Sequence, residues 1–255
     1  MDKGKKAFSA LLFLFFATAI FAQNKQTIKV DEFEFSMVEI SGKNFAIAET
    51  EVTQDIYEHI MGENPSHNVG EKFPVENVSW YDAIVFCNLL SEATGRKAVY
   101  SVDGNSDTES WEYSAHGGAG ILGNVEIDLS ANGFRLPNED EWIYAAKGGE
   151  DFLYSGSDDA KEVAWFSRTS GSFTHEVASK KPNGYALYDM SGNVWEWCND
   201  KIKGTRFRVK KGGSWSSDKE LCALSFRGLH YPSRYQPCYT YFNMGFRLAF
   251  SVVHH

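Results

Sequence analysis

Cysteine is scarce in this chain, with four residues among 255, and no two of them stand at C-x-x-C spacing. The histidines are scattered as well, so the sequence shows no cysteine–histidine cluster of the kind that holds zinc. The G-x-S-x-G motif, which presents the nucleophile of many serine hydrolases, is also missing. These absences exclude a zinc module and a hydrolase with that nucleophile.

The four cysteines are Cys87, Cys198, Cys222 and Cys238. In an oxidising compartment they allow up to two disulfides, in three connectivities. A domain of this length does not need a disulfide to be stable, so buried free thiols are an equal alternative.

Long hydrophobic runs are equally rare. The only one, residues 7–22, follows three lysines and is short for a membrane-spanning helix. This arrangement predicts a secretory signal peptide over residues 1–22, cleaved after Ala19 or Ala22. We therefore expect export to the periplasm, the outer surface or the medium, with no transmembrane segment in the mature chain. A retained N-terminal anchor is the alternative.

Basic residues are outnumbered: 25 Lys and Arg stand against 34 Asp and Glu, which gives a formal net charge of −9. Removing residues 1–22 takes away a net +2 and leaves −11. A chain this acidic is poorly suited to nucleic acid or to anionic membrane surfaces. We expect a protein or surface ligand of unknown identity as its partner, and no nucleic acid.

Local patterns predict short elements. Residues 23–34 are polar and indicate a frayed lead-in, and residues 35–51 indicate two strands around a turn at 41–44. A hairpin is expected over residues 98–134, with turns at Asp103-Gly104 and Gly117-Gly118. Three helices are bounded by capping residues: Thr53 to about Met61 before Gly62, Ser79 to Gly95 with Asp82 in a capping box, and Asn138 to Gly148 with Glu141 in another.

The second half of the chain has no long helical period, no internal repeat and no domain linker. Its short apolar runs alternate with Gly, Asn and Ser. An aromatic content of 15% lets such a loop-rich chain still bury a large apolar area. We therefore expect a single α+β domain with many loops, spanning residues 35–251.

The run DMSGNVWE carries two carboxylates seven residues apart, Asp189 and Glu196, with a turn at Gly192-Asn193 between them. In a tight loop such carboxylates and the carbonyls between them converge on one point, and hard oxygen ligands suit calcium. The alternative is a structural turn in which the carboxylates accept backbone N–H groups.

Residues 215–244 are rich in aromatic residues and arginine, the residue types that dominate binding hot spots. The candidates for ligand contact are Trp215, His230, Tyr231, Arg234, Tyr235, Tyr239 and Tyr241. The alternative, that these side chains form an ordinary core, is favoured for Phe226, Arg227 and Phe242.

Five motifs in a fixed order resemble the formylglycine-generating enzyme (sulfatase-modifying factor) family. They are VSWYDAIVFCNLLSE (78–92), RLPNEDEWIYAAKGG (135–149), PNGYALYDMSGNVWEWC (182–198), GGSW (212–215) and GFRL (245–248). The resemblance covers residues 37–250. It implies an elaborated C-type lectin-like fold with little regular secondary structure.

The same resemblance implies two metal sites. The family's calcium loop corresponds to the side chains of Asp189 and Glu196 and the carbonyls of Gly192 and Val194, so structural calcium is expected. The family's enzymes bind copper(I) through two cysteines that follow GGS and oxidise a substrate cysteine to formylglycine. Those positions are Ser217 and Cys222 here. Because a hydroxyl cannot replace a thiolate as a copper(I) ligand, copper is not expected.

The chain is also similar to variable proteins that retroelements diversify, the treponemal ones in particular, in which the segment before GFR forms the ligand-binding surface. We predict an exported, non-catalytic domain that displays residues 215–244 to a ligand. Two alternatives stay open: a metal-dependent oxidase of the formylglycine type that acts on protein cysteine, and a structural subunit of a surface machine.

Overall fold

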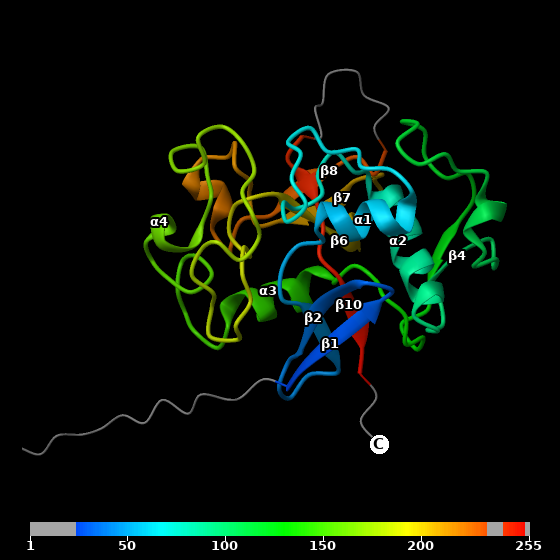
Figure 1. Cartoon of the computed structure of the whole chain (residues 1–255), viewed down its shortest axis with the longest axis horizontal. Coiled ribbons are helices and arrows are strands. Elements are labelled where there is room, and N and C mark those ends of the chain that lie inside the picture. Colours follow the sequence, from blue (N-terminus) through cyan, green and yellow to red (C-terminus); the bar gives the residue numbers. More distant parts are fainter. Residues whose placement is uncertain (1–23, 234–241, 253–255) are drawn as a thin grey trace, which may run out of the picture.

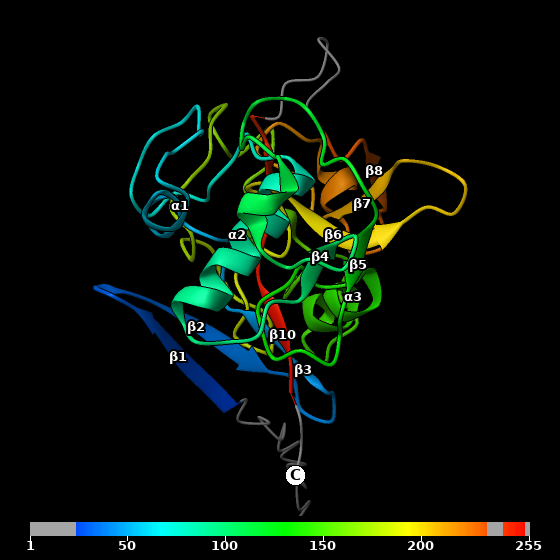
Figure 2. The ribbon, with the colours of Figure 1, turned by 90° about the vertical axis from the view of Figure 1, so that its right-hand side faces the viewer.

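The first and last strands of the fold meet in one antiparallel sheet. In the computed structural model, which describes residues 24–233 and 242–252, this sheet has the order β1–β2–β3–β10 (Figures 1 and 2). Its strands are β1 (Asn24–Val30), β2 (Phe33–Glu39), β3 (Phe45–Ala48) and β10 (Ala249–Ser251). Because β10 pairs with β3, the C-terminal part of the chain closes onto the N-terminal sheet.

Strand β1 overturns the prediction of a frayed lead-in over residues 23–34. It pairs with β2 along its whole length, and Ile28 and Val30 are buried between exposed neighbours. The remaining side chains of this edge strand are polar and exposed, which hides its two apolar positions in the sequence. Regular structure in the described residues therefore starts at Asn24, ahead of residue 35, where the sequence predicts the first strand.

The three predicted helices are confirmed. They are α1 (Gln54–Met61), α2 (Trp80–Ala93) and α3 (Glu139–Lys147), and a short α4 (Ala160–Val163) was not foreseen. Both predicted capping boxes form, at Ser79 with Asp82 and at Asn138 with Glu141. These reciprocal bonds satisfy backbone donors that the first turn of a helix leaves free, which is why so local a pattern locates a helix start. Within the described residues, no helix combines the length and the apolar composition that crossing a bilayer requires.

A small hairpin of β4 (Tyr100–Val102) and β5 (Val125–Ile127) follows α2. The chain turns at Asp103-Gly104, where both residues have positive φ, as predicted. Between the two strands lies a long loop with a 3₁₀ helix (Thr108–Trp111). The Gly117-Gly118 pair lies in this loop and is not a strand-to-strand turn, so that part of the prediction is wrong.

A second four-stranded sheet, in the order β8–β7–β6–β9, carries the motifs of the C-terminal half. Its strands are β6 (Trp195–Lys201), β7 (Arg208–Lys211), β8 (Gly228–His230) and β9 (Met244–Gly245). Strand β9 runs parallel to β6, with Glu196 opposite Gly245. A side chain on Gly245 would place its Cβ 2.4 Å from the Val75 carbonyl oxygen, so this close approach requires glycine. The pairing sets the GFRL motif beside the DMSGNVWE loop.

Tryptophans connect the two halves of the core. Trp80, Trp142 and Trp197 are fully buried, and each ring N–H has a partner. Trp80 donates to the Cys198 carbonyl and Trp197 to the Val78 carbonyl, both at 3.1 Å. A buried indole needs such a partner, and these bonds tie irregular loops to strands. The structure is thus the predicted loop-rich α+β domain.

Candidate functional site

Ser217, at the first position of the family's cysteine pair, closes a turn. Its hydroxyl lies 2.9 Å from the Ser214 hydroxyl and accepts the Ser214 main-chain N–H at 3.1 Å. The Ser217 main-chain N–H donates in turn to the Ser214 carbonyl at 3.0 Å. Both side chains are buried. The residue therefore holds the backbone in place and presents no soft ligand.

Cys222, at the second position, follows on a 3₁₀ helix (Lys219–Cys222) and is fully buried. It packs in an apolar cluster with Tyr154 and Phe166, and a Cβ on Gly213 would lie 2.5 Å from its Sγ. Burial raises the pKa of this thiol to about 12. Without a bound metal the thiol is therefore protonated at neutral pH, which makes it a poor nucleophile.

The other described cysteines are also free. Cys87 and Cys198 are buried, and burial raises the pKa of both thiols. Of the two alternatives for the cysteines, buried free thiols hold for Cys87, Cys198 and Cys222, while Cys238 lies outside the described residues.

Glu196 does not fit the predicted calcium loop. Its Oε2 accepts Nε of Arg247 and Nε1 of Trp142, and its Oε1 accepts Nη2 of Arg247, each at 2.7 Å. All three side chains are fully buried. The carboxylate is thus occupied by a bidentate ion pair and an indole, which leaves it poorly placed to hold a cation.

Asp189 retains an oxygen that finds no protein partner. Its Oδ2 accepts the Ala178 N–H at 2.7 Å, while its buried Oδ1 is unpaired among the described residues. Burial, opposed by that hydrogen bond and by Arg247, raises the pKa of this carboxyl to about 6. Glu51 is buried nearby, and burial together with Asp189 and Glu196 holds its pKa well above the usual range.

Three carboxyls, those of Glu51, Asp189 and Glu196, thus surround the guanidinium of Arg247. Within residues 24–233 and 242–252, no three His, Cys, Asp or Glu side chains are grouped so that they could hold a metal ion. The set Asp189, Gly192, Val194 and Glu196 does not fit calcium as a group, because one of its two carboxylates already neutralises Arg247. Calcium binding stays a prediction.

The candidate ligand segment is described only in part. Arg234, Tyr235, Tyr239 and Tyr241 lie outside the described residues. Trp215 is half-buried, and its ring N–H donates to the Phe242 carbonyl at 3.0 Å, so it anchors the segment from within.

His230 and Tyr231 are half-buried at the end of β8. The His230 ring meets Trp197 edge-on, with 5.8 Å between centroids, and burial lowers the pKa of its imidazole. The Tyr231 ring packs on Phe207, 4.5 Å away. Tyr231, Pro232 and Ser233 also line a cleft of about 590 Å³. Sequence reasoning had no means of finding this cleft, because its walls come from four separate segments.

Both flanks of residues 234–241 are fixed to the framework by main-chain bonds. The Trp80 N–H donates to the Pro232 carbonyl at 3.0 Å, and the Trp195 N–H donates to the Asn243 carbonyl at 2.8 Å. The ring of Phe242 also stacks on His67, with 4.6 Å between centroids. The described residues on either side of this segment are therefore fixed to the framework.

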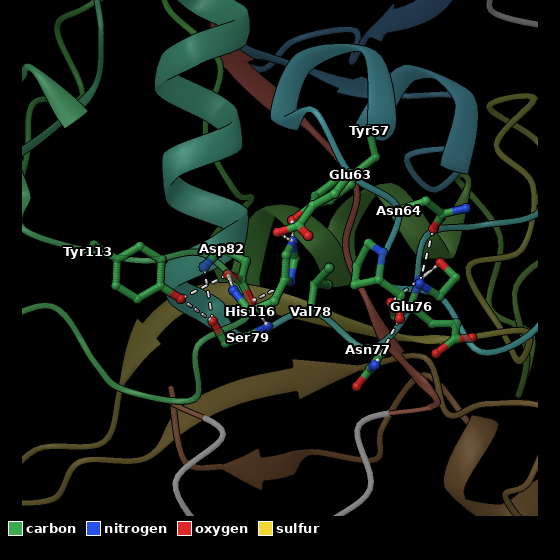
Figure 3. A network of polar contacts seen from close by, with 12 residues as sticks. Tyr57, Glu63, Asn64, Glu76, Asn77, Val78, Ser79, Asp82, Tyr113 and His116 are labelled. Atoms are coloured by element: carbon green, nitrogen blue, oxygen red, sulfur yellow. Dashed lines mark hydrogen bonds and ion pairs between the residues drawn. The ribbon is translucent and has the colours of Figure 1, made fainter. Parts of the chain in front are cut away.

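A polar network, which the sequence did not indicate, stiffens that framework (Figure 3). The Tyr113 hydroxyl lies 3.0 Å from the Ser79 hydroxyl and donates to Asp82 at 2.9 Å. The His116 main-chain N–H donates to the same carboxylate oxygen at 2.9 Å, and its ring lies 3.3 Å from the Tyr57 hydroxyl. Asp82 thus serves as helix cap and loop clamp at once, joining α1, α2 and the loop after the 3₁₀ helix.

The chain belongs to the sulfatase-modifying factor family: the Sulfatase-modifying factor enzyme 1-like domain matches residues 14–252. It is 35% identical over 225 residues to the Chaperone protein LppX of Paenibacillus barcinonensis, which covers 78% of this chain and 79% of that protein. It is 28% identical over 182 residues to the Formylglycine-generating enzyme of Mus musculus, covering 65% of this chain and 41% of the enzyme. Among solved structures, Treponema denticola variable protein 1 superimposes with a TM-score of 0.73 and 34% identity, covering 89% of this chain and 99% of that one. The predicted family and fold are confirmed.

Proposed function

We propose that this protein is an exported, non-catalytic recognition domain whose binding surface is formed by residues 215–244. One observation carries the proposal: the two positions that would hold copper are a serine bonded within a turn and a buried, protonated thiol. A serine hydroxyl is a hard oxygen ligand, and a single thiol does not make the pair of soft ligands that copper(I) prefers. This supports a scaffold that lacks the family's oxidase chemistry.

The likeness to the treponemal variable protein supports recognition as the role of that scaffold. So do the described flanks of the candidate surface, which are fixed to a network-stiffened base next to a cleft. A binding segment held by a rigid platform loses less conformational entropy when it binds, and this preorganisation increases affinity. Export is supported by the lysine-rich start and apolar stretch of residues 1–22.

A panning experiment tests the proposal. A random peptide phage library is selected on the wild-type domain, and the clones are then measured against a triple variant, Tyr231→Ala, Tyr235→Ala and Tyr239→Ala. We expect clones that bind the wild type and lose binding to the variant, while the melting temperature stays nearly unchanged. Unfolding of the triple variant would instead assign these tyrosines to the core. Stoichiometric copper(I) binding with oxidation of a substrate cysteine would overturn the non-catalytic role.

A chaperone role is the second candidate, favoured by the match to a protein named as a chaperone over most of its length. The recognition role and the chaperone role both require a surface that contacts other proteins, and neither requires a redox centre. Suppression of the aggregation of an unfolding client, lost in the same triple variant, would select the chaperone role. Sequence-selective peptide binding without such suppression would select recognition.

A further inference from the structure

The cleft beside Tyr231 is built from four segments that the fold brings together. Tyr81 on α2 and the loop 120–123 form one side, the β6–β7 hairpin forms another, and residues 231–233 complete it. A Cβ on Gly120 would lie 2.8 Å from the Tyr81 ring, so the loop rests directly on that side chain. The volume of about 590 Å³ lies within the range of ligand-binding pockets, roughly 300–1,000 Å³.

The charged side chains that line this cleft in the described part of the chain are all basic: Lys201, Arg206 and Arg208. Among the ion pairs of the described residues, none involves these three cations. Asp200 acts on Arg208 from nearby, but the chain as a whole carries a net charge of −9, so a cleft lined by three cations is not a consequence of composition.

Strand pairing makes this arrangement unfavourable for the unbound fold. Lys201 on β6 stands directly opposite Arg208 on β7. Side chains at directly opposed positions of an antiparallel pair lie on the same face, and like charges there are destabilising. Because a bound anion would offset the repulsion between these two cations, such a destabilising pair is expected at a site that binds an anion.

Arg208 is also held in position. Its guanidinium lies 3.6 Å from the centre of the Trp80 ring, and its Nη1 donates to the Asn199 carbonyl at 2.6 Å. A planar, oriented guanidinium is suited to bidentate pairing with a carboxylate.

We propose that this cleft binds an acidic peptide segment of a partner protein, with carboxylates on Arg206, Arg208 and Lys201. The inference rests on the proposed function and specifies its ligand. A peptide is favoured over a sulfated sugar because the rim carries Leu122, which is 81% exposed and offers an apolar contact beside the charges. Tyr81 and Tyr231 add aromatic walls, which match an interface of apolar anchors with charged partners.

The test uses three labelled probes: a peptide of alternating Glu and Leu, its Gln–Leu counterpart, and a heparin-derived oligosaccharide. Binding is followed by fluorescence anisotropy at low and high salt. Arg206→Glu should lower the affinity for the acidic peptide by about tenfold or more, because it reverses one of the positive charges in the cleft. Lys203→Glu is the matched control, because Lys203 is exposed in the same hairpin turn and does not line the cleft. The affinity of this variant for the acidic peptide should stay within about twofold of wild type. Arg208 is left intact because of its packing on Trp80.

Equal binding of the Glu and Gln peptides, equal losses in Arg206→Glu and Lys203→Glu, or binding of the oligosaccharide alone would each overturn the proposal. Clones from the phage library separate this inference from the recognition function. If clones lose binding through the tyrosine substitutions but not through Arg206→Glu, the recognition function stands and the acidic-peptide cleft fails. If no clone depends on the tyrosines, the proposed function itself fails.

Discussion

The Glu196 carboxylate and the Arg247 guanidinium form a bidentate ion pair, with both contacts at 2.7 Å and both side chains fully buried. Arg247 also donates to the carbonyls of Ala48 and Tyr188, at 3.0 and 2.8 Å. One side chain therefore joins the two four-stranded sheets and the DMSGNVWE loop. The arginine of the GFRL motif is a structural centre of the fold, and it is bonded to Glu196, which the sequence predicts as a calcium ligand.

Replacing Arg247 with Met should destabilise the protein by about 3–5 kcal/mol, because Glu196 would be left buried without its counter-charge. Urea unfolding measures the loss. Arg227→Met is the matched control, since Arg227 pairs with Glu139 but is 48% exposed, and such a pair contributes at most about 1 kcal/mol. Equal, small effects of the two substitutions would contradict a central role for the buried pair.

Asp189→Asn should stabilise the protein above pH 6. The folded-state pKa of about 6 exceeds the ordinary value of 3.8, so the folded state holds this proton more tightly than the unfolded chain does. The associated stability is complete below pH 3.8 and is lost as the pH rises through about 6, at a cost on the order of 3 kcal/mol. Asparagine removes that cost and tolerates the φ of 57° at this position.

The measurement for Asp189→Asn is thermal unfolding across pH 4 to 8, compared with the fully exposed Asp151→Asn as control. The increase in melting temperature of Asp189→Asn over wild type should shrink toward pH 4, where the wild-type carboxyl is protonated. Calcium is added in a parallel series. A large rise in the wild-type melting temperature with calcium, abolished in Asp189→Asn, would restore the calcium loop and require Glu196 to leave Arg247.

The described thiols should resist labelling in the native state. In a Cys238→Ser background, Ellman's reagent at pH 8 should react only after urea is added, because Cys87, Cys198 and Cys222 are buried. The positive control adds Ser216→Cys to the same background. Ser216 is exposed and adjacent to Ser217, so this new thiol should react with the reagent at once. Rapid labelling of Cys222 in the native state would show that the buried cluster around this thiol opens to solvent. It would then favour the oxidase alternative.

Trp215 should contribute mainly to the stability of the fold and not to direct contact with a ligand. Trp215→Phe removes the bond to the Phe242 carbonyl and should cost about 1 kcal/mol, whereas Trp215→Ala should cost about 2–3 kcal/mol through lost packing. Chemical denaturation measures both. If Trp215→Ala unfolds normally yet loses peptide binding, the residue contacts ligand directly, as the sequence suggests.

Local chemistry explains which elements could be predicted from the sequence. The capping boxes at Ser79 and Asn138 are complete within four residues, so they locate α2 and α3 without tertiary information. Strand β1 has only two inward apolar positions, and its pairing with β2 decides the outcome. Secondary structure that depends on a neighbouring strand leaves a weak local signal.

The chemistry of the site is harder to predict because its partners are far apart in the chain. Glu196 and Arg247 meet through the parallel pairing of β6 with β9, which no short-range pattern encodes. A carboxylate suits a calcium ion and a guanidinium equally well, so residue type alone does not choose between them. The basic cleft depends in the same way on the pairing of β7 with β8.

A main-chain bond holds each of Pro232 and Asn243, and the side-chain amide of Asn243 also donates to the Ser216 hydroxyl. Such bonds are indifferent to which side chains stand between them, so randomising the codons for residues 234–241 should yield mostly well-folded proteins. Such tolerance would make this domain a usable starting point for engineered binders.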